Sequence, residues 1–258
     1  MQSFHTSAST MAQLQKMLDV TGQNLANANT NGYKRKEGQF NELLVRNIEN
    51  GRGAEGPQTT PPGLRLGTGG YVASEVTRFA SGSFRETGRA LDLALKNKNH
   101  FFGVIDADGE TKLTRDGNLQ LMPTGNGQVL LTDDAGRAVA NTNNERIELP
   151  ETASNIQIGS DGNVSGVVGG ERRIFARIGV GVVENLADLE PVGGGLFTAV
   201  GPYDVATGNP IMVGGLESSN VDMGQEMTEL MQIQRAYQFN SRALSTSDQM
   251  MGIVSSLK

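Results

Sequence analysis

The sequence predicts an α+β protein that is mainly β, with a central β domain and N- and C-terminal helices that pair as a coiled-coil-like layer. Apolar residues recur every seven positions near both ends of the chain, which is typical of helices that pack along one another. Between these ends, glycine is frequent and apolar residues alternate as in half-buried strands. We therefore expect four parts: an N-terminal helix at 1–35, a Gly/Pro-rich linker at 36–70, a β domain at 71–215 and a C-terminal helix at 216–258.

The clearest helix signal runs from Leu216 to Lys258. This stretch contains no proline, and its apolar residues form a narrow stripe that needs a partner, either the N-terminal helix or another subunit. Polar residues near its start are suited to cap the helix and complement its dipole. The residues that we expect at an assembly contact are Leu230, Tyr237, Leu244 and Met251, with Asn220, Asp222 and Arg235 as polar partners.

A second seven-residue repeat lies near the N-terminus and runs into the asparagine-rich stretch N-L-A-N-A-N-T-N-G. An ordinary amphipathic helix on a local core explains the repeat equally well, but a heptad helix at the other end of the chain favours pairing. The asparagines either mark a helix end running into a turn or form an amide network in an assembly. We expect Met11, Leu18, Asn24, Leu25 and Asn27 to belong to the assembly contact, although packing between the two helices of one chain would use the same apolar residues.

The middle of the chain has the signals of strands and turns. Three prolines in the linker, Pro57, Pro61 and Pro62, discourage helix. We expect one half-buried strand to hold Ile174, Ile178, Val180 and Val182, which share one parity. Hairpin turns are predicted at Asp108-Gly109, Asp116-Gly117 and Asp161-Gly162.

Composition argues against several functional classes. The formal net charge of −6 disfavours bulk nucleic-acid binding, and the absence of cysteine excludes disulfides and Cys-based metal sites. The two histidines, His5 and His100, lack metal-ligand spacing, and Asp106-Ala107-Asp108-Gly109 begins like a calcium loop without its later acidic ligands. We therefore expect no catalytic residue, no metal and no cofactor.

Targeting signals are not evident in the sequence. The first residues lack a charged region followed by an apolar one, so we expect no cleaved secretory signal. No apolar run approaches the length of a membrane-spanning helix, so we expect no membrane insertion.

Several motifs carry a resemblance to a known family. L-D-V-T-G-Q-N-L-A-N-A-N-T-N-G-Y-K near the N-terminus, and L-E-S-S-N-V-D with the following Q-R-A-Y and N-S-R, resemble the terminal signatures of the bacterial flagellar rod and hook axial proteins. In between, S-G-S-F-R-E-T-G-R, F-F-G-V and L-T-R-D-G-N-L resemble middle-domain motifs of this family in the same order. G-L-R-L-G-T-G at 63–69 resembles the distal rod members. K-N-K-N-H at 96–100 departs from the family, which usually has a glycine-containing turn there.

The resemblance implies a structural subunit of the flagellar rod, which self-assembles into a helical tube and transmits torque to the hook. It implies contacts with copies of itself, other rod proteins, the hook protein and the flagellar export apparatus, and with ring proteins around the rod. The location it implies is the basal body in the cell envelope. Two alternatives stay open: a proximal rod or hook-type member of the family, and a secreted wall-active enzyme with a coiled-coil tail, which would keep its activity without the terminal helices.

Overall fold

The computed structural model describes residues 2–42, 45–48, 64–67 and 70–256, and its backbone divides into two compact units. Unit 1 consists of residues 1–26, 36–76 and 222–258, and unit 2 consists of residues 27–35 and 77–221. Both terminal helices belong to unit 1, and unit 2 is built from strands. The predicted α+β class with mainly β structure is thereby confirmed.

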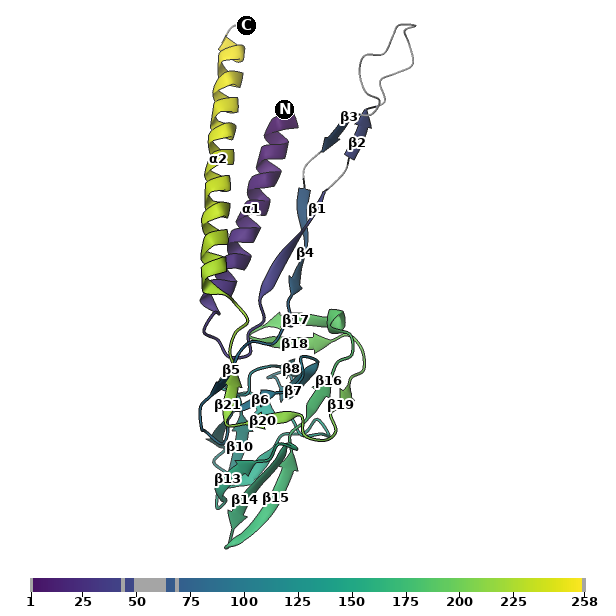
Figure 1. Cartoon of the computed structure of the whole chain (residues 1–258), viewed down its shortest axis with the longest axis vertical. Coiled ribbons are helices and arrows are strands. Elements are labelled where there is room, and N and C mark those ends of the chain that lie inside the picture. The colour runs from purple at the N-terminus through teal and green to yellow at the C-terminus, as the bar shows by residue number, and fades with distance from the viewer. Residues whose placement is uncertain (1, 43–44, 49–63, 68–69, 257–258) are drawn as a thin grey trace. The chain divides into compact units, whose positions relative to one another are not determined.

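Unit 1 contains two helices that pack along one another (Figure 1). Unit 1 also contains two pairs of strands, β1 with β4 and the antiparallel pair of β2 with β3. The described part of the stretch predicted as a linker therefore contributes strands, while Pro57, Pro61 and Pro62 lie outside the described residues. A coiled-coil geometry for the helix pair stays a prediction. The elements are α1 (Gln2–Ala26), β1 (Lys36–Glu42), β2 (Val45–Ile48), β3 (Leu64–Gly67), β4 (Gly70–Thr77) and α2 (Met223–Ser256).

Helix α2 begins later than predicted. The side-chain Oδ1 of Asp222 accepts hydrogen bonds from the backbone N–H groups of Gly224 at 2.8 Å and Gln225 at 3.2 Å, which makes Asp222 the capping residue. The expected start at residue 216 is wrong because Leu216 and Glu217 are paired in strand β21 instead. The expectation that a polar residue near the start of this stretch caps the helix is thereby confirmed.

Unit 2 contains one large antiparallel sheet in the order β12-β10-β11-β7-β8-β18-β17, to which β9, β16 and β19 are attached. A separate three-stranded sheet has the order β13-β14-β15, and two further pairs join β20 to β6 and β21 to β5. The strands of the first half are β5 (Phe84–Glu86), β6 (Leu93–Leu95), β7 (His100–Ile105), β8 (Thr111–Thr114), β9 (Gln120–Pro123), β10 (Gln128–Thr132), β11 (Ala138–Val139) and β12 (Glu148–Pro150). The remaining elements are β13 (Ser154–Ile158), β14 (Asn163–Val168), β15 (Glu171–Arg177), β16 (Val180–Val182), the 3-10 helix η1 (Leu186–Asp188), β17 (Leu189–Gly193), β18 (Leu196–Ala199), β19 (Asp204–Val205), β20 (Ile211–Val213) and β21 (Gly215–Glu217).

The core of unit 2 has two parts. The larger part gathers aliphatic side chains from most strands around Phe102, which is fully buried. The smaller part is built on three aromatic rings, Phe79, Phe101 and Phe197, whose centroids lie 5.2 to 6.0 Å apart in tilted or edge-on arrangements. Such ring pairs contribute about 0.5–1.5 kcal/mol each beyond the area that they bury.

The turn predictions for this unit are correct in two cases of three. Asp108-Gly109 joins β7 to β8 and Asp161-Gly162 joins β13 to β14, each as the turn of an antiparallel hairpin. The third prediction, Asp116-Gly117, is wrong because β9 pairs with β10 rather than with β8, and the carbonyl of Gly117 accepts the N–H of Leu93.

The predicted strand from Ile174 to Val182 is also corrected. It is divided between β15 and β16, and its first member, Ile174, is 66% exposed while Ile178 and Val180 are buried. The common parity holds for Ile178 and Val180 but not for Ile174, because the pairing of β14 with β15 shifts register between Ile174 and Ala176 and interrupts the alternation there.

Candidate functional site

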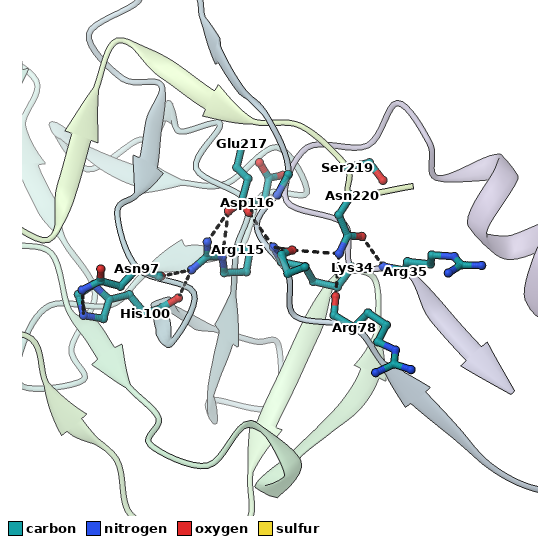
Figure 2. Close-up of polar contacts among 12 residues, drawn as sticks. Lys34, Arg35, Arg78, Asn97, His100, Arg115, Asp116, Glu217, Ser219 and Asn220 are labelled. Carbon is teal, nitrogen blue, oxygen red and sulfur yellow. Dashed lines mark hydrogen bonds and ion pairs between the residues drawn. The ribbon is translucent and has the colours of Figure 1, made fainter. Parts of the chain in front are cut away.

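The most heavily buried polar cluster of unit 2 joins three charged side chains from distant parts of the sequence. Glu217, at the end of β21, accepts from the Lys34 ammonium at 2.7 Å and from Arg115 Nη2 at 2.6 Å (Figure 2). All three side chains are at most 5% exposed. We call Lys34, Arg115 and Glu217 the ion triad. Two cations and one carboxylate leave it with a formal charge of +1.

Arg115 is the most completely satisfied member of the ion triad. Its Nη1 donates to the carbonyl oxygens of Asn97 at 2.7 Å and His100 at 2.6 Å, and its Nε makes a second bond to Glu217 at 3.0 Å. The guanidinium carbon also lies 5.6 Å from the centroid of the Phe101 ring. These contacts tie the turn between β6 and β7 to the end of β21.

Burial and the charges of neighbouring groups determine the direction in which each pKa of the ion triad is shifted. Burial lowers the pKa of Lys34, and the charge of Arg115 lowers it further, against the opposing effect of Glu217. Burial alone would raise the pKa of Glu217, but the charges of Arg115 and Lys34 outweigh it and hold that pKa below its usual value. The negative charge of the Glu217 carboxylate therefore stabilises the charged forms of both buried cations, Lys34 and Arg115.

Two glycines allow the backbones to approach closely around the ion triad. A Cβ on Gly82 would lie 1.8 Å from the carbonyl oxygen of Ser218, and one on Gly32, whose φ is +67°, would lie 2.5 Å from the carbonyl carbon of Arg115. The N–H of Gly82 uses this proximity to donate to Glu217 Oε1 at 3.0 Å. Any larger residue at either position would force the segments apart.

Asn220 fastens the segments that lie beside the ion triad. Its Oδ1 accepts the N–H of Arg35 at 2.7 Å, and its Nδ2 donates to the carbonyl oxygens of Arg78 at 2.7 Å and Ala80 at 3.0 Å (Figure 2). Three stretches of unit 2 are thus bonded through one amide. Asn220 was expected as a polar partner in an assembly contact, and the structure gives it an intramolecular role.

Asn24 has a corresponding role in unit 1. Its side chain donates to the Lys36 carbonyl at 2.8 Å and accepts the Lys36 N–H at 2.9 Å, so it pairs with the start of β1 as a backbone would. Its Nδ2 also lies 3.1 Å from Glu226 Oε2 in the first turn of α2, and Asn24 and Glu226 are each 1% exposed. The asparagine-rich stretch therefore includes both a helix end and an amide that bonds neighbouring backbone.

We expect Asn24→Ala to lower the free energy of unfolding by about 1–3 kcal/mol, because it leaves the Lys36 backbone groups and Glu226 buried without this partner. Asn27→Ala is the matched control, since Asn27 is only half-buried and its side chain accepts from the exposed hydroxyl of Thr30. Thermal unfolding followed by far-UV circular dichroism measures both variants. Equal losses would contradict the role of Asn24.

The predicted apolar contact residues lie on shielded faces of the two helices. Ile233 is buried on α2, and its neighbours on the same face are half-buried. Since α1 packs along α2, we assign this face to the contact between them. Arg235 and Asp222 are exposed, and the side chain of Met251 lies outside the described residues. The half-buried members of the prediction are Met11, Leu18, Leu25, Leu230, Tyr237 and Leu244. Their expected assembly role stays a prediction.

The sequence reasoning overlooked a second apolar face on α2. Met223, Met227 and Met231 follow one another at four-residue intervals and are each about half exposed. Farther along, Phe239 is 72% exposed. The four-residue spacing was a usable signal for Met227 and Met231, whereas Met223, seven residues before Leu230, lies in line with the heptad stripe. We call the exposed apolar residues that share the face opposite Ile233 the outer stripe of α2: Met227, Met231, Phe239 and Ile253.

We looked for a metal site and for a membrane-spanning helix among the residues that the structure describes, and found neither. Among these residues, no group of three or more His, Asp or Glu side chains is arranged to hold a metal ion. Neither helix, over its described residues, combines the length and the apolar character needed to cross a bilayer. The side chain of His5 lies outside the described set, and His100 has its pKa lowered by burial and by Arg115.

Comparison with known proteins finds family models that match the two ends and the middle of the chain, and relatives that match it over its full length. Three family models match in order: flagella basal body rod protein at residues 4–34, flagellar hook protein FlgE/F/G D1 domain at 97–166, and flagellar basal body rod FlgEFG protein C-terminal at 212–257. The chain is 34% identical to the flagellar basal-body rod protein FlgG of Bacillus subtilis, over 100% of this chain and 99% of the other. It is 32% identical to the flagellar hook-basal body complex protein FlhP of Bacillus subtilis and 32% identical to FlgG of Caulobacter vibrioides, each over 100% of both chains.

Proposed function

We propose that this chain, which belongs to the family of flagellar basal-body rod proteins, is a structural subunit of the rod that polymerises into a helical tube. The observation that carries the proposal is the match to FlgG proteins over the full length of the chain. The two long terminal helices and the β-rich unit 2 suit a subunit that makes contacts at several radii of a filament. The role is mechanical, with torque passing through subunit contacts towards the hook.

The outer stripe of α2 is the contact that we assign to neighbouring subunits. Its apolar side chains are exposed in the single chain, and a stripe of this length needs burial against another molecule. Burying a methionine or phenylalanine side chain contributes about 1.5–3 kcal/mol, so several of them stabilise a polymer strongly. The shielded face of α2 then holds α1, and the outer stripe holds the next copy.

Partners other than the chain itself follow from membership of the family. We propose that the rod ends contact other rod proteins and the hook protein, that ring proteins surround the rod, and that the flagellar export apparatus secretes the chain without cleaving a signal. The stretch at 63–69 and the FlgG relatives favour the distal part of the rod over a proximal or hook-type position.

Electron microscopy of basal bodies from cells that lack this gene, together with a swimming assay, tests the proposal. Non-motile cells whose basal bodies stop short of the hook are expected, and the stopping point separates a distal from a proximal position. Complete basal bodies with hooks in swimming cells would overturn the proposal and bring forward the wall-active enzyme.

The assembly role of the outer stripe has its own test. We expect Met231→Asp with Phe239→Asp to reduce swimming to background, because charges placed in a buried apolar contact are strongly unfavourable. Asn126→Asp with Asn143→Asp adds the same charges at exposed polar positions of unit 2, outside α2, and is expected to swim. Circular dichroism of the purified variants checks that both remain folded. Normal swimming of the Met231/Phe239 variant would rule out the outer stripe as a contact.

A further inference from the structure

The chain contains two Asn-Gly dipeptides, Asn31-Gly32 and Asn126-Gly127. Asparagine is a chemically labile residue, and it is most labile before glycine, because glycine has no side chain to hinder attack by its own backbone nitrogen. That nitrogen attacks the side-chain carbonyl carbon of the asparagine and displaces the amide. In a folded protein the backbone must be free to bring these two atoms together. The surroundings of each dipeptide therefore decide whether it reacts.

Asn31-Gly32 is held firmly beside the ion triad. The N–H of Gly32 donates to the carbonyl oxygen of Glu217 at 2.8 Å, so the nitrogen that would attack is already engaged. Gly32 is buried, and its backbone packs closely against the main chain of Arg115. The side-chain Oδ1 of Asn31 accepts from Arg85 Nη2 at 3.4 Å. Reaction at Asn31 thus requires this part of unit 2 to open first.

Asn126-Gly127 lies in the turn that joins β9 to β10, where the backbone has more room. All four residues of this turn, 124–127, are exposed. Within the described part of the chain, neither the side chain of Asn126 nor the N–H of Gly127 makes a hydrogen bond. Gly127 has a φ of +73°, and a Cβ built on it would have no other part of the chain within 4 Å. The Gly127 nitrogen is therefore free to approach Cγ of Asn126.

The hairpin around this turn is anchored on both sides of the reacting bond. The N–H of Thr124 donates to the carbonyl oxygen of Gln128 at 2.9 Å, and the carbonyl oxygen of Gly127 accepts from the N–H of Glu151 at 3.0 Å. The motion that the reaction needs is confined to the peptide unit between Asn126 and Gly127. The sheet does not have to open, so the reaction is compatible with the folded state.

We infer that Asn126 is a site of spontaneous deamidation in the folded protein, whereas Asn31 is protected. The Gly127 nitrogen loses its proton and bonds to Cγ of Asn126, while the bond from Cγ to the side-chain nitrogen breaks. The departing nitrogen takes up a proton from solvent and leaves as ammonia. Water then opens the succinimide ring at either of its carbonyl groups and leaves aspartate or isoaspartate. Overall, water is consumed and ammonia is released, and no other reactant is needed.

The modification adds a negative charge to the tip of the β9–β10 hairpin. The formal net charge of the chain changes from −6 to −7, and the new carboxylate joins the exposed side chains of Glu148 and Glu151 on the neighbouring stretch. Because the reaction begins with loss of the Gly127 amide proton, it is faster at higher pH. The charge therefore accumulates with the age of the folded chain. This inference does not depend on the proposed polymer.

Peptide mapping by mass spectrometry, with chromatographic separation of the aspartate and isoaspartate peptides, tests the inference on the purified full-length chain. In folded protein at mildly alkaline pH, we expect product at Asn126 to form at least about tenfold faster than at Asn31, which corresponds to an opening free energy of at least about 1.4 kcal/mol at Asn31. In concentrated urea the two rates are expected to become similar, because neither dipeptide is then restrained. Equal rates in the folded chain, or faster reaction at Asn31, would overturn the inference.

Two variants separate the reactivity of one site from the protection of the other. Asn126→Gln lengthens the side chain and disfavours ring closure, so isoelectric focusing of aged protein is expected to lose its acidic band. An acidic band of unchanged intensity would mean that another residue reacts instead. Glu217→Gln weakens the ion triad beside Gly32 and is expected to speed the reaction at Asn31 while leaving the rate at Asn126 unchanged. An unchanged rate at Asn31 in this variant would contradict its protection by the fold.

Discussion

Glu217→Gln is expected to lower the free energy of unfolding by about 3–5 kcal/mol, the largest effect of any single substitution that we consider. The glutamine keeps the size of the side chain and its ability to accept from Gly82, but it leaves Lys34 and Arg115 as two buried cations without a counter-charge. Their repulsion, which Glu217 now offsets, then adds to the cost of burying each.

Lys34→Met is the informative control for this prediction. It removes the surplus cation and leaves a neutral pair between Arg115 and Glu217, which retains two hydrogen bonds of 2.6 and 3.0 Å. The expected loss is about 1 kcal/mol, for the hydrogen bonds that Lys34 donates to Glu217 and Ala80, because the Ala80 carbonyl still accepts from Asn220 and Glu217 keeps Arg115 and Gly82. Urea unfolding followed by circular dichroism compares the two variants. Equal losses of unfolding free energy would show that the charge balance of the ion triad does not determine its contribution to stability.

The helices were predictable from the sequence because their signal is local and repeated. Residues seven apart lie on one face of a helix whatever the rest of the chain does, so the heptads located α1 and α2 correctly. The start of α2 was misplaced because Leu216 and Glu217 pair with β5, more than 100 residues away. A non-local strand pair of this kind leaves no trace in the local pattern.

The polar site was only partly predictable for a related reason. Asn24 and Asn220 were singled out because asparagine is disfavoured inside helices and common at their ends, and both make several hydrogen bonds, although within one chain. The ion triad was missed, since Lys34, Arg115 and Glu217 are separated by 102 and 183 positions along the sequence and each resembles an ordinary surface charge. Their partnership depends on the topology of unit 2.

A second large effect is expected at Asp116, which stands beside the triad but outside it. The pKa of this carboxyl is raised to about 7, mainly by burial and also by the nearby Asp134 and Asp133 carboxylates, against the opposing effect of the bond from the Asn118 N–H. Arg137 does not relieve this repulsion fully, because it is engaged by Asp133 at 2.6 Å. The folded protein therefore holds a proton at Asp116 that the unfolded chain has released above pH 3.8, its ordinary value.

Stability consequently falls as the pH rises from about 4 to about 7, because the folded state binds the extra proton throughout that range. The full effect is about 4 kcal/mol at most, and screening at a partly exposed carboxyl reduces it. We expect Asp116→Asn to be more stable than the wild type at pH 8 by about 1–4 kcal/mol and equal to it at pH 4, since asparagine keeps the bond from Asn118 without a charge.

Urea unfolding of both proteins at several pH values measures the difference in their free energies of unfolding. The contributions of titratable groups that the two chains share cancel in this difference. Asp134→Asn is the companion variant: it removes one repulsive neighbour but leaves Asp116 buried, so a smaller gain at pH 8 is expected. A difference between Asp116→Asn and the wild type that stays constant from pH 4 to pH 8 would mean that Asp116 is ionised in the folded protein throughout. In that case the penalty for its burial would have to be offset by contacts other than the bond from Asn118.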